Sequence, residues 1–186
     1  MFDLDEFIAS CNDALAEAQP ALAVKELVER AVSRPTEIDA ELGPVDGWSL
    51  RTLYAADDLT ILQFVWPPHV VLFPHDHQMW AANGIYGGGE DNTFYRRTDD
   101  GLEVSGGSEL RAGDVALLGR DVVHSVENPR RSYAAALHVY GGDFFGAPRS
   151  QWDPVTGSRS PFDVEDVRRT LADAQARAEP APDDPG

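Results

Sequence analysis

The sequence predicts a mainly β protein, a barrel or sandwich, with helices at both ends of the chain. Short apolar runs alternate with turn residues through the middle, and the 186 residues include 16 glycines and 13 prolines. Helical spacing of apolar residues is confined to the two ends. A chain of this length suits one domain with a sizeable core, so we expect a single domain with helical additions.

Two helices are predicted before the β region, from Asp3 to about Ala18 and from Pro20 to about Ser33, where apolar residues recur at helical spacing. Asp3 can cap the first helix, and Pro20 stands where proline is tolerated, in the first turn of the second. Residues 35–50, rich in glycine and proline, are predicted to be loop.

The β region begins at residue 49 and predicts many short strands with regular turn spacing, as in a barrel or sandwich. A flexible turn is predicted at residues 87–92, which contain three glycines. The predicted strands cover residues 50–54, 59–66, 70–77, 93–97, 102–104, 108–111, 114–118, 122–127 and 133–140.

An irregular stretch follows residue 142, and a last helix is predicted from Asp163 to about Ala178. The final residues have too little apolar area to bury and are expected to be disordered. The predicted organisation is a helical segment 1–48 that packs on the barrel, a barrel 49–160, a C-terminal helix 161–178 and a disordered tail 179–186.

The net charge of −17, with Lys25 as the single lysine, disfavours nucleic acid and anionic membranes as partners. Cys11 is the single cysteine, so an internal disulfide is excluded, which fits a reducing compartment. We find no secretory leader and no apolar stretch long enough to span a membrane. We therefore expect a soluble, cytoplasmic protein; its oligomeric state is left open.

Three histidines predict a metal site. His75 and His77 are two residues apart, and residues i and i+2 of a strand point to the same side of a sheet. His124, on a later predicted strand, can supply a third imidazole. Such a facial set leaves the opposite side of a metal open for substrate and oxygen.

These motifs resemble those of the cupin superfamily, the double-stranded β-helix or jelly-roll barrels that hold a metal between two sequence motifs. The pair at His75 and His77 resembles the first motif, and the run from Gly113 through His124 to Asn128 resembles the second. This chain departs from both motifs. Gly119 and Asp121 replace a proline and a glycine of the second, and Ala81 stands where the first has a glutamate ligand.

A cupin site of three histidines without the glutamate resembles that of the cysteine dioxygenase family, which holds ferrous iron and adds O2 to a substrate sulfur. His138 and Tyr140 match the last two members of that family's Ser-x-His-x-Tyr triad, with Ala136 in place of serine. The resemblance implies that Tyr140 donates a hydrogen bond near the metal and that His138 orients it. Many animal enzymes of this family have a cysteine at the position of Ala82. Bacterial relatives such as 3-mercaptopropionate dioxygenase also lack that cysteine, so its absence points toward the bacterial branch.

A substrate carboxylate would be bound by a guanidinium, whose planar fork fits carboxylate geometry. Arg149 matches the carboxylate-binding arginine of the bacterial mercaptopropionate-type enzymes, and Arg51 matches the position in the animal type. We rank Arg149 first, because the loop around it could close over a barrel mouth.

The leading hypothesis is therefore an Fe(II)- and O2-dependent bacterial dioxygenase that oxidises a small thiol carboxylate, cysteine or 3-mercaptopropionate in type, to its sulfinate. Its partners would be a small anionic substrate and O2. Two alternatives remain open: a metal-dependent cupin enzyme acting on a non-thiol organic acid, and a non-catalytic cupin that binds a metal or small molecule.

Overall fold

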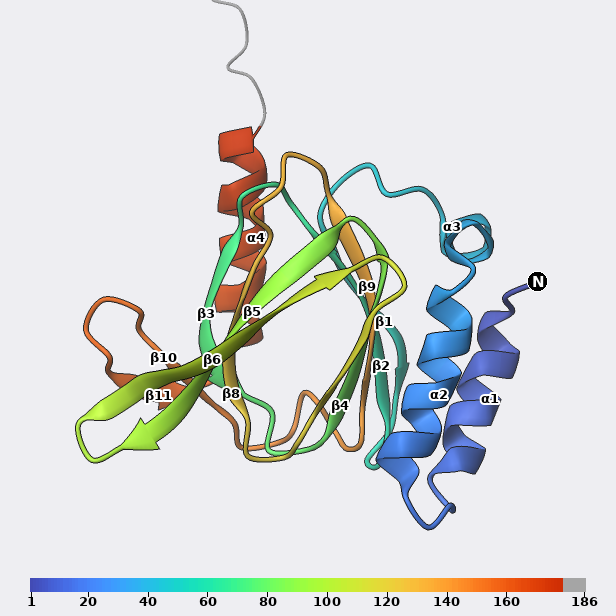
Figure 1. Cartoon of the computed structure of the whole chain (residues 1–186), viewed down its shortest axis with the longest axis horizontal. Coiled ribbons are helices and arrows are strands. Elements are labelled where there is room, and N and C mark those ends of the chain that lie inside the picture. The colour runs from blue at the N-terminus through green and yellow to red at the C-terminus, as the bar shows by residue number, and fades with distance from the viewer. Residues whose placement is uncertain (179–186) are drawn as a thin grey trace, which may run out of the picture.

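The computed structural model describes residues 1–178 and contains two antiparallel sheets that face each other (Figure 1). The predicted tail, 179–186, lies outside the described residues. In spatial order, the five-stranded sheet consists of β1 (Ser49–Ala55), β2 (Thr60–Trp66), β9 (Ala134–Tyr140), β4 (Ala81–Gly87) and β7 (Val115–Leu118). The six-stranded sheet consists of β11 (Arg159–Pro161), β10 (Ser150–Trp152), β3 (Val71–Asp76), β8 (Val123–Glu127), β5 (Gly89–Thr98) and β6 (Gly101–Arg111).

The chain crosses repeatedly from one sheet to the other, so strands consecutive in sequence are often not neighbours in space. From β2 to β4 it passes to the six-stranded sheet and back, and it does so again from β7 to β9. This is the winding of a double-stranded β-helix, which closes most strand edges against neighbours. The predicted fold class is confirmed: a mainly β jelly-roll barrel with helices at its two ends.

Helices cover the five-stranded sheet from outside. α1 (Leu4–Ala14) and α2 (Pro20–Val32) lie beside it in Figure 1, and α2 packs on β4, β7 and β9. At the other side of the barrel, α4 (Val164–Ala178) packs near β3, with Leu171 fully buried.

Because helices cover the outer face of the five-stranded sheet, its central strands are buried on both faces and carry mostly apolar side chains. Along β2, Ile61 and Val65 join the core under the helices, whereas Phe64 and Trp66 point into the barrel. All seven residues of β2 and of β9 are buried, as expected for strands with both faces covered. On β9, the same alternation sends the even-numbered residues, including Tyr140, into the barrel.

One predicted loop contains a helix. α3 (Pro35–Leu42) occupies the first half of the stretch 35–50, and it buries Ile38 and Leu42. The many glycines and prolines suggested a loop, but two of them mark the ends of the helix. Pro35 lies in its first turn, and Gly43 directly follows its last residue.

The predicted turn at residues 87–92 is also wrong. Only Gly88 turns, with φ of 63°, between the end of β4 and the start of β5. A side chain there would meet the Tyr133 backbone oxygen at 2.4 Å, so the glycine is needed for a close approach of two chain segments. β4 was missed by the sequence prediction, as were the short strands β10 and β11 in the irregular stretch.

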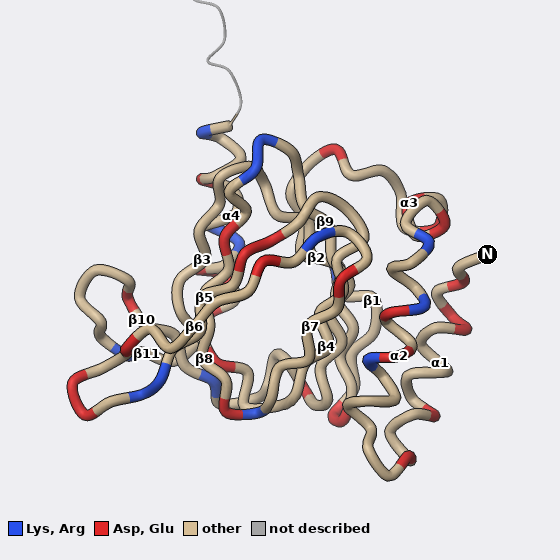
Figure 2. The backbone as a smooth tube through the Cα atoms, viewed as in Figure 1, with Lys and Arg blue, Asp and Glu red and all other residues tan. Residues whose placement is uncertain are grey.

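Lys and Arg are scattered among the more numerous Asp and Glu residues along the chain (Figure 2). Of the helices in residues 1–178, none is long and apolar enough to cross a membrane.

Candidate metal centre

Strands β3 and β8 bring the three histidines together. His75 and His124 are directly paired across these antiparallel strands, and His77 follows just beyond the end of β3. All three side chains are buried, and one ligand nitrogen from each lies within 4.8 Å of the others. The three residues predicted to hold a metal ion could therefore do so together.

Hydrogen bonds set the tautomers of two of these imidazoles. His75 Nδ1 lies 3.1 Å from the Phe73 carbonyl oxygen, and His124 Nδ1 lies 2.7 Å from Asn92 Oδ1. Both partners are acceptors, so each Nδ1 carries the proton and each Nε2 keeps a lone pair. His124 Nε2 in turn lies 3.3 Å from His77 Nε2.

The imidazoles are held in their neutral form. Burial lowers the pKa of His75 to about 4 and lowers the pKa values of His77 and His124 well below the ordinary value. The charge of Arg149 also lowers the pKa of His75 and of His77. Neutral imidazoles with converging lone pairs form a donor set that suits a divalent transition metal, so the residues present fit the ion that cupin sites hold.

A small cavity lies beside these rings. It has a volume of about 10 Å³, roughly the space of one water molecule. Its wall is mainly aromatic and includes, besides the three histidines, Phe64, Trp66, His138, Tyr140, Phe144 and Phe162.

His138 and Tyr140 lie two residues apart on β9 and both face this cavity. His138 Nδ1 is 2.9 Å from the Tyr140 hydroxyl, and the Tyr140 ring packs edge-on against His77 with centroids 5.1 Å apart. Burial lowers the pKa of His138 to about 3 and raises the pKa of Tyr140. The pair is therefore a neutral imidazole and a neutral phenol beside the metal ligands.

Arg149 is 5% exposed, and its guanidinium carbon lies 3.8 Å from the ring centre of Phe144 and 3.9 Å from that of Phe162. Nη2 donates to the Phe144 carbonyl oxygen at 2.6 Å. Within the described part of the chain, Nε and Nη1 have no hydrogen-bond partner. Burial lowers the pKa of Arg149 to about 10, so it remains a cation at neutral pH.

Asp76 ties the Arg149 segment to the histidine strand. Its carboxylate accepts from the Ser150 backbone N–H at 2.9 Å and from Arg97 Nη2 at 2.6 Å. Its side chain is fully buried, whereas that of Arg97 is 40% exposed. This anchor, between two metal ligands, was not singled out from the sequence.

Arg51 lies elsewhere. It is exposed on β1, and its Nη1 donates to the Leu42 carbonyl oxygen at the end of α3. Neither arginine lines the histidine cavity, but Arg149 packs against Phe144 and Phe162, which do. Of the two arginines that the sequence offered, the structure brings Arg149 to the site and leaves Arg51 beside the N-terminal helices.

Asn92 and Glu90 are the functional candidates that sequence reasoning missed. Both fall in the segment predicted to be a turn, yet both are buried on β5 and Asn92 contacts a metal ligand. Their spacing of two residues was the available signal, since it places both side chains on one face of a strand.

No protein-family model matches the sequence, and the solved structures that resemble this chain are all distant from it. A protein with a double-stranded β-helix domain from Klebsiella pneumoniae subsp. pneumoniae MGH 78578 is 15% identical, with a TM-score of 0.42 over 58% of this chain and 86% of that one. The DMSP lyase DddQ from Ruegeria pomeroyi DSS-3 is 18% identical, with a TM-score of 0.44 over 55% of this chain and 50% of that one. The Schizosaccharomyces pombe Cnp3 cupin domain is 10% identical, with a TM-score of 0.43 over 52% of this chain and 65% of that one. Of these three neighbours, one is described as a double-stranded β-helix domain, one as an enzyme and one as a cupin domain. Likenesses at this level do not extend to the activity of this chain.

Proposed function

We propose that the protein is an Fe(II)- and O2-dependent dioxygenase that converts a small thiol carboxylate to its sulfinate. The observation that carries the proposal is a buried arginine with unpaired donors next to a cluster of three neutral imidazoles. The reaction adds both atoms of O2 to the thiolate sulfur, R–S⁻ + O2 → R–SO2⁻, so it needs no further reductant.

The metal would be held by His75, His77 and His124, and a ferrous ion there supplies neighbouring positions for a thiolate and for O2. Three neutral ligands leave the full positive charge of the ion uncompensated. That charge favours an anionic substrate over a neutral one.

Arg149 would bind the substrate carboxylate. A buried cation that lacks an ion partner is costly, and an incoming carboxylate that accepts from Nε or Nη1 removes that cost. An outer pocket of about 370 Å³ opens on the far side of Arg149 and is lined also by Ser150 and Arg159. Since the inner cavity holds only about one water, we expect Phe144 and Phe162 to move when substrate enters.

Tyr140 would orient the reacting groups. When the neutral His138 donates from Nδ1 to the phenol oxygen, the Tyr140 hydroxyl proton is free to point into the cavity. The raised pKa of Tyr140 keeps that proton in place at neutral pH, so the phenol is a hydrogen-bond donor throughout.

The direct test is oxygen uptake by the iron-loaded chain with cysteine, 3-mercaptopropionate and related thiols, with one sulfinate formed for each O2 consumed. Hydroxy and keto acids of the same length serve as thiol-free controls. An iron-loaded chain that consumes no O2 with any thiol contradicts the dioxygenase assignment.

Arg149→Gln tests the carboxylate contact. Loss of a charge-assisted hydrogen bond should raise KM by roughly tenfold or more, because such bonds contribute about 1.5–3 kcal/mol. Arg51→Gln, on β1 and outside both pockets, is the matched control and should leave KM within about twofold. Equal KM values for Arg149→Gln and the unmodified chain would exclude Arg149 as the carboxylate ligand.

A second candidate is a metal-dependent enzyme acting on a non-thiol organic acid. Ala136 favours it: the residue is fully buried on β9 where the thiol dioxygenase triad has a serine, so one link of that hydrogen-bond relay is missing. Turnover of a thiol-free acid in the same screen, without thiol oxidation, supports this candidate over the first.

A further inference from the structure

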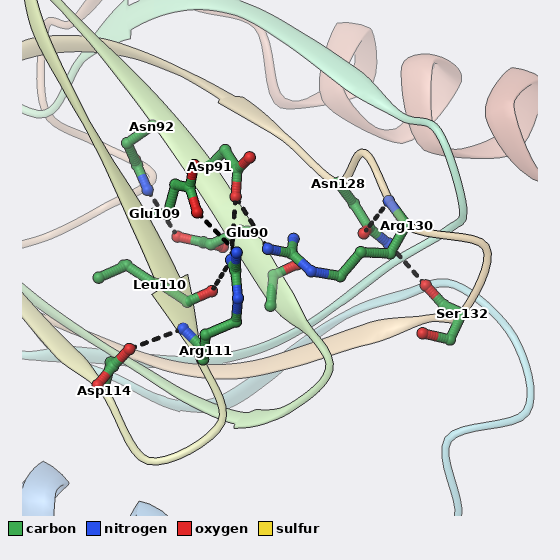
Figure 3. A network of polar contacts seen from close by, with 11 residues as sticks. Glu90, Asp91, Asn92, Glu109, Leu110, Arg111, Asp114, Asn128, Arg130 and Ser132 are labelled. Carbon is green, nitrogen blue, oxygen red and sulfur yellow. Dashed lines mark hydrogen bonds and ion pairs between the residues drawn. The ribbon is translucent and has the colours of Figure 1, made fainter.

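Strand β5 buries a carboxylate beside the metal centre. Glu90 is 0% exposed and Asn92 is 4% exposed, and both face the barrel interior. Asp91, between them, points outward and is ion-paired with Arg111 and Arg130 (Figure 3). No lysine or arginine in residues 1–178 pairs with Glu90, whose Oε2 lacks a hydrogen-bond partner there.

Glu90 is linked to a metal ligand through one amide. Asn92 Nδ2 donates to Glu90 Oε1 at 3.2 Å, and Asn92 Oδ1 lies 2.7 Å from His124 Nδ1 (Figure 3 shows the first contact). Above its pKa of about 7, Glu90 is a carboxylate and can only accept. It then keeps the NH2 group of the amide on its own side and directs the amide oxygen at His124.

That orientation determines which nitrogen of His124 carries the proton. An amide oxygen facing Nδ1 requires Nδ1–H, which leaves the Nε2 lone pair for the metal. With the amide reversed, its NH2 group would face Nδ1 and stabilise the tautomer whose Nε2 is protonated and cannot bind.

We propose that Glu90 and Asn92 are positioning residues for the metal, in which the Glu90 carboxylate acts through Asn92 to hold His124 in its metal-binding tautomer. The inference rests on the metal site of the proposed function but on no particular reaction. His75 is held differently: its Nδ1 contacts the backbone carbonyl oxygen of Phe73, which no side-chain substitution removes. His124 is thus the ligand whose basicity a side chain controls.

The stability of the chain separates this role from a merely structural one. Burial raises the pKa of Glu90 to about 7, so the carboxylate is unfavourable in the folded chain. A nearby Trp66 indole N–H lowers that pKa, yet Trp66 Nε1 makes no hydrogen bond of ordinary geometry to any described residue. Replacing the carboxylate by an apolar side chain of similar length should therefore raise the melting temperature of the metal-free chain at pH 8 while weakening metal binding.

The experiment measures cobalt(II) affinity at pH 8, by competition with a chelator, and the visible spectrum of the bound cobalt. Glu90→Met, which removes the acceptor and keeps a side chain of similar length, and Asn92→Ala should each weaken binding by about 10–100-fold and alter the spectrum. The double variant should bind no more weakly than Asn92→Ala, since two links of one chain are not additive. Asp91→Asn, one residue away but outward-facing, should stay within about twofold of the unmodified chain.

A Glu90→Met chain that is folded and binds cobalt(II) as tightly as the unmodified chain, with the same spectrum, overturns the inference and leaves the metal site standing. Should the unmodified chain itself bind no cobalt(II), the metal site fails and the inference fails with it. A thermal melt of each metal-free variant shows whether it is folded. Should Asn92→Ala not fold, Glu90→Met alone decides.

Discussion

At the scale of single residues, the site depends on which histidine nitrogens carry protons. The second ring nitrogen of His75 is bound by a backbone carbonyl and that of His124 by an amide, so both lone pairs are directed inward. His77 Nδ1 has no hydrogen-bond partner among the described residues. Its ring is instead positioned by packing against the rings of Tyr140 and His124.

His124→Ala should abolish metal retention, because two remaining imidazoles cannot form a facial set. We expect a loss of affinity of more than about 100-fold, beyond what changes to outer partners of a ligand cause. Metal content after dialysis, measured by elemental analysis, checks this. The control is His69→Asn, since His69 is exposed with φ of 58°, which asparagine tolerates. Full occupancy of the His124→Ala chain would contradict the ligand assignment.

At the scale of elements, the site is held between strands that side chains tie together. β10 is anchored to β3 through Asp76 and through the pairing of Gln151 with His75, so the arginine segment is linked directly to the histidine strand. On the other side, α2 lies directly on β4 at Gly84, where a side chain would meet Val28 Cγ1 at 2.3 Å and Val32 Cγ1 at 2.8 Å.

Asp76→Asn should destabilise the chain by about 2 kcal/mol, because a charge-assisted hydrogen bond and an ion pair to a partly exposed arginine are lost together. Urea unfolding of the metal-free chain measures the change. Asp99→Asn, on an exposed turn, is the matched control and should cost less than about 0.5 kcal/mol. Equal costs for the two variants would mean that the anchor contributes nothing to stability.

Gly84→Ala should destabilise the chain by roughly 1–3 kcal/mol, because the added methyl group forces α2 away from the sheet. Gly106→Ala is its control: Gly106 is also on a strand, and a side chain there has no atom within 4 Å. The melting temperatures of the two variants make the comparison. No difference between them would show that α2 can shift at little cost.

At the scale of the whole molecule, the barrel buries several ionisable groups that affect stability in opposite directions. Burial lowers the pKa values of His75, His77, His124 and His138 and raises that of Glu90. Below pH 6.5 the unfolded chain binds protons that the buried histidines do not, so acid favours unfolding. Between pH 4.5 and about 7, Glu90 has the opposite effect, because it holds a proton more tightly when folded.

The histidines outnumber the carboxylate, so the metal-free chain should lose stability as pH falls from 6.5 toward 5. Each histidine contributes up to about 1.4 kcal/mol per pH unit. Denaturant unfolding at closely spaced pH values measures this, and His138→Phe should flatten the slope. A free energy of unfolding that stays constant from pH 6.5 to 5 would show that these imidazoles are not buried in solution.

The sequence alone predicted a mainly β body, the two short N-terminal helices, the last helix and a pair of histidines, His75 and His77, on one side of a strand. These follow from local rules: residues of one face recur with the period of their element, and two imidazoles at i and i+2 share a side wherever the strand lies. Arg149, His138 and Tyr140 were named from a resemblance. The structure places His138 and Tyr140 in the wall of the histidine cavity and Arg149 behind that wall, against Phe144 and Phe162.

The folded chain places Arg149 rather than Arg51 against the aromatic wall of the histidine cavity, because their positions depend on which sheet each segment joins. It also brings Glu90 and Asn92 to the metal centre: their glycine-rich surroundings indicate a turn locally, but pairing with β6 and β8 makes them part of a buried strand. The physical reason is the same in both cases. Burial and partners arise from segments far apart in the chain, whereas sequence patterns report only the preferences of near neighbours.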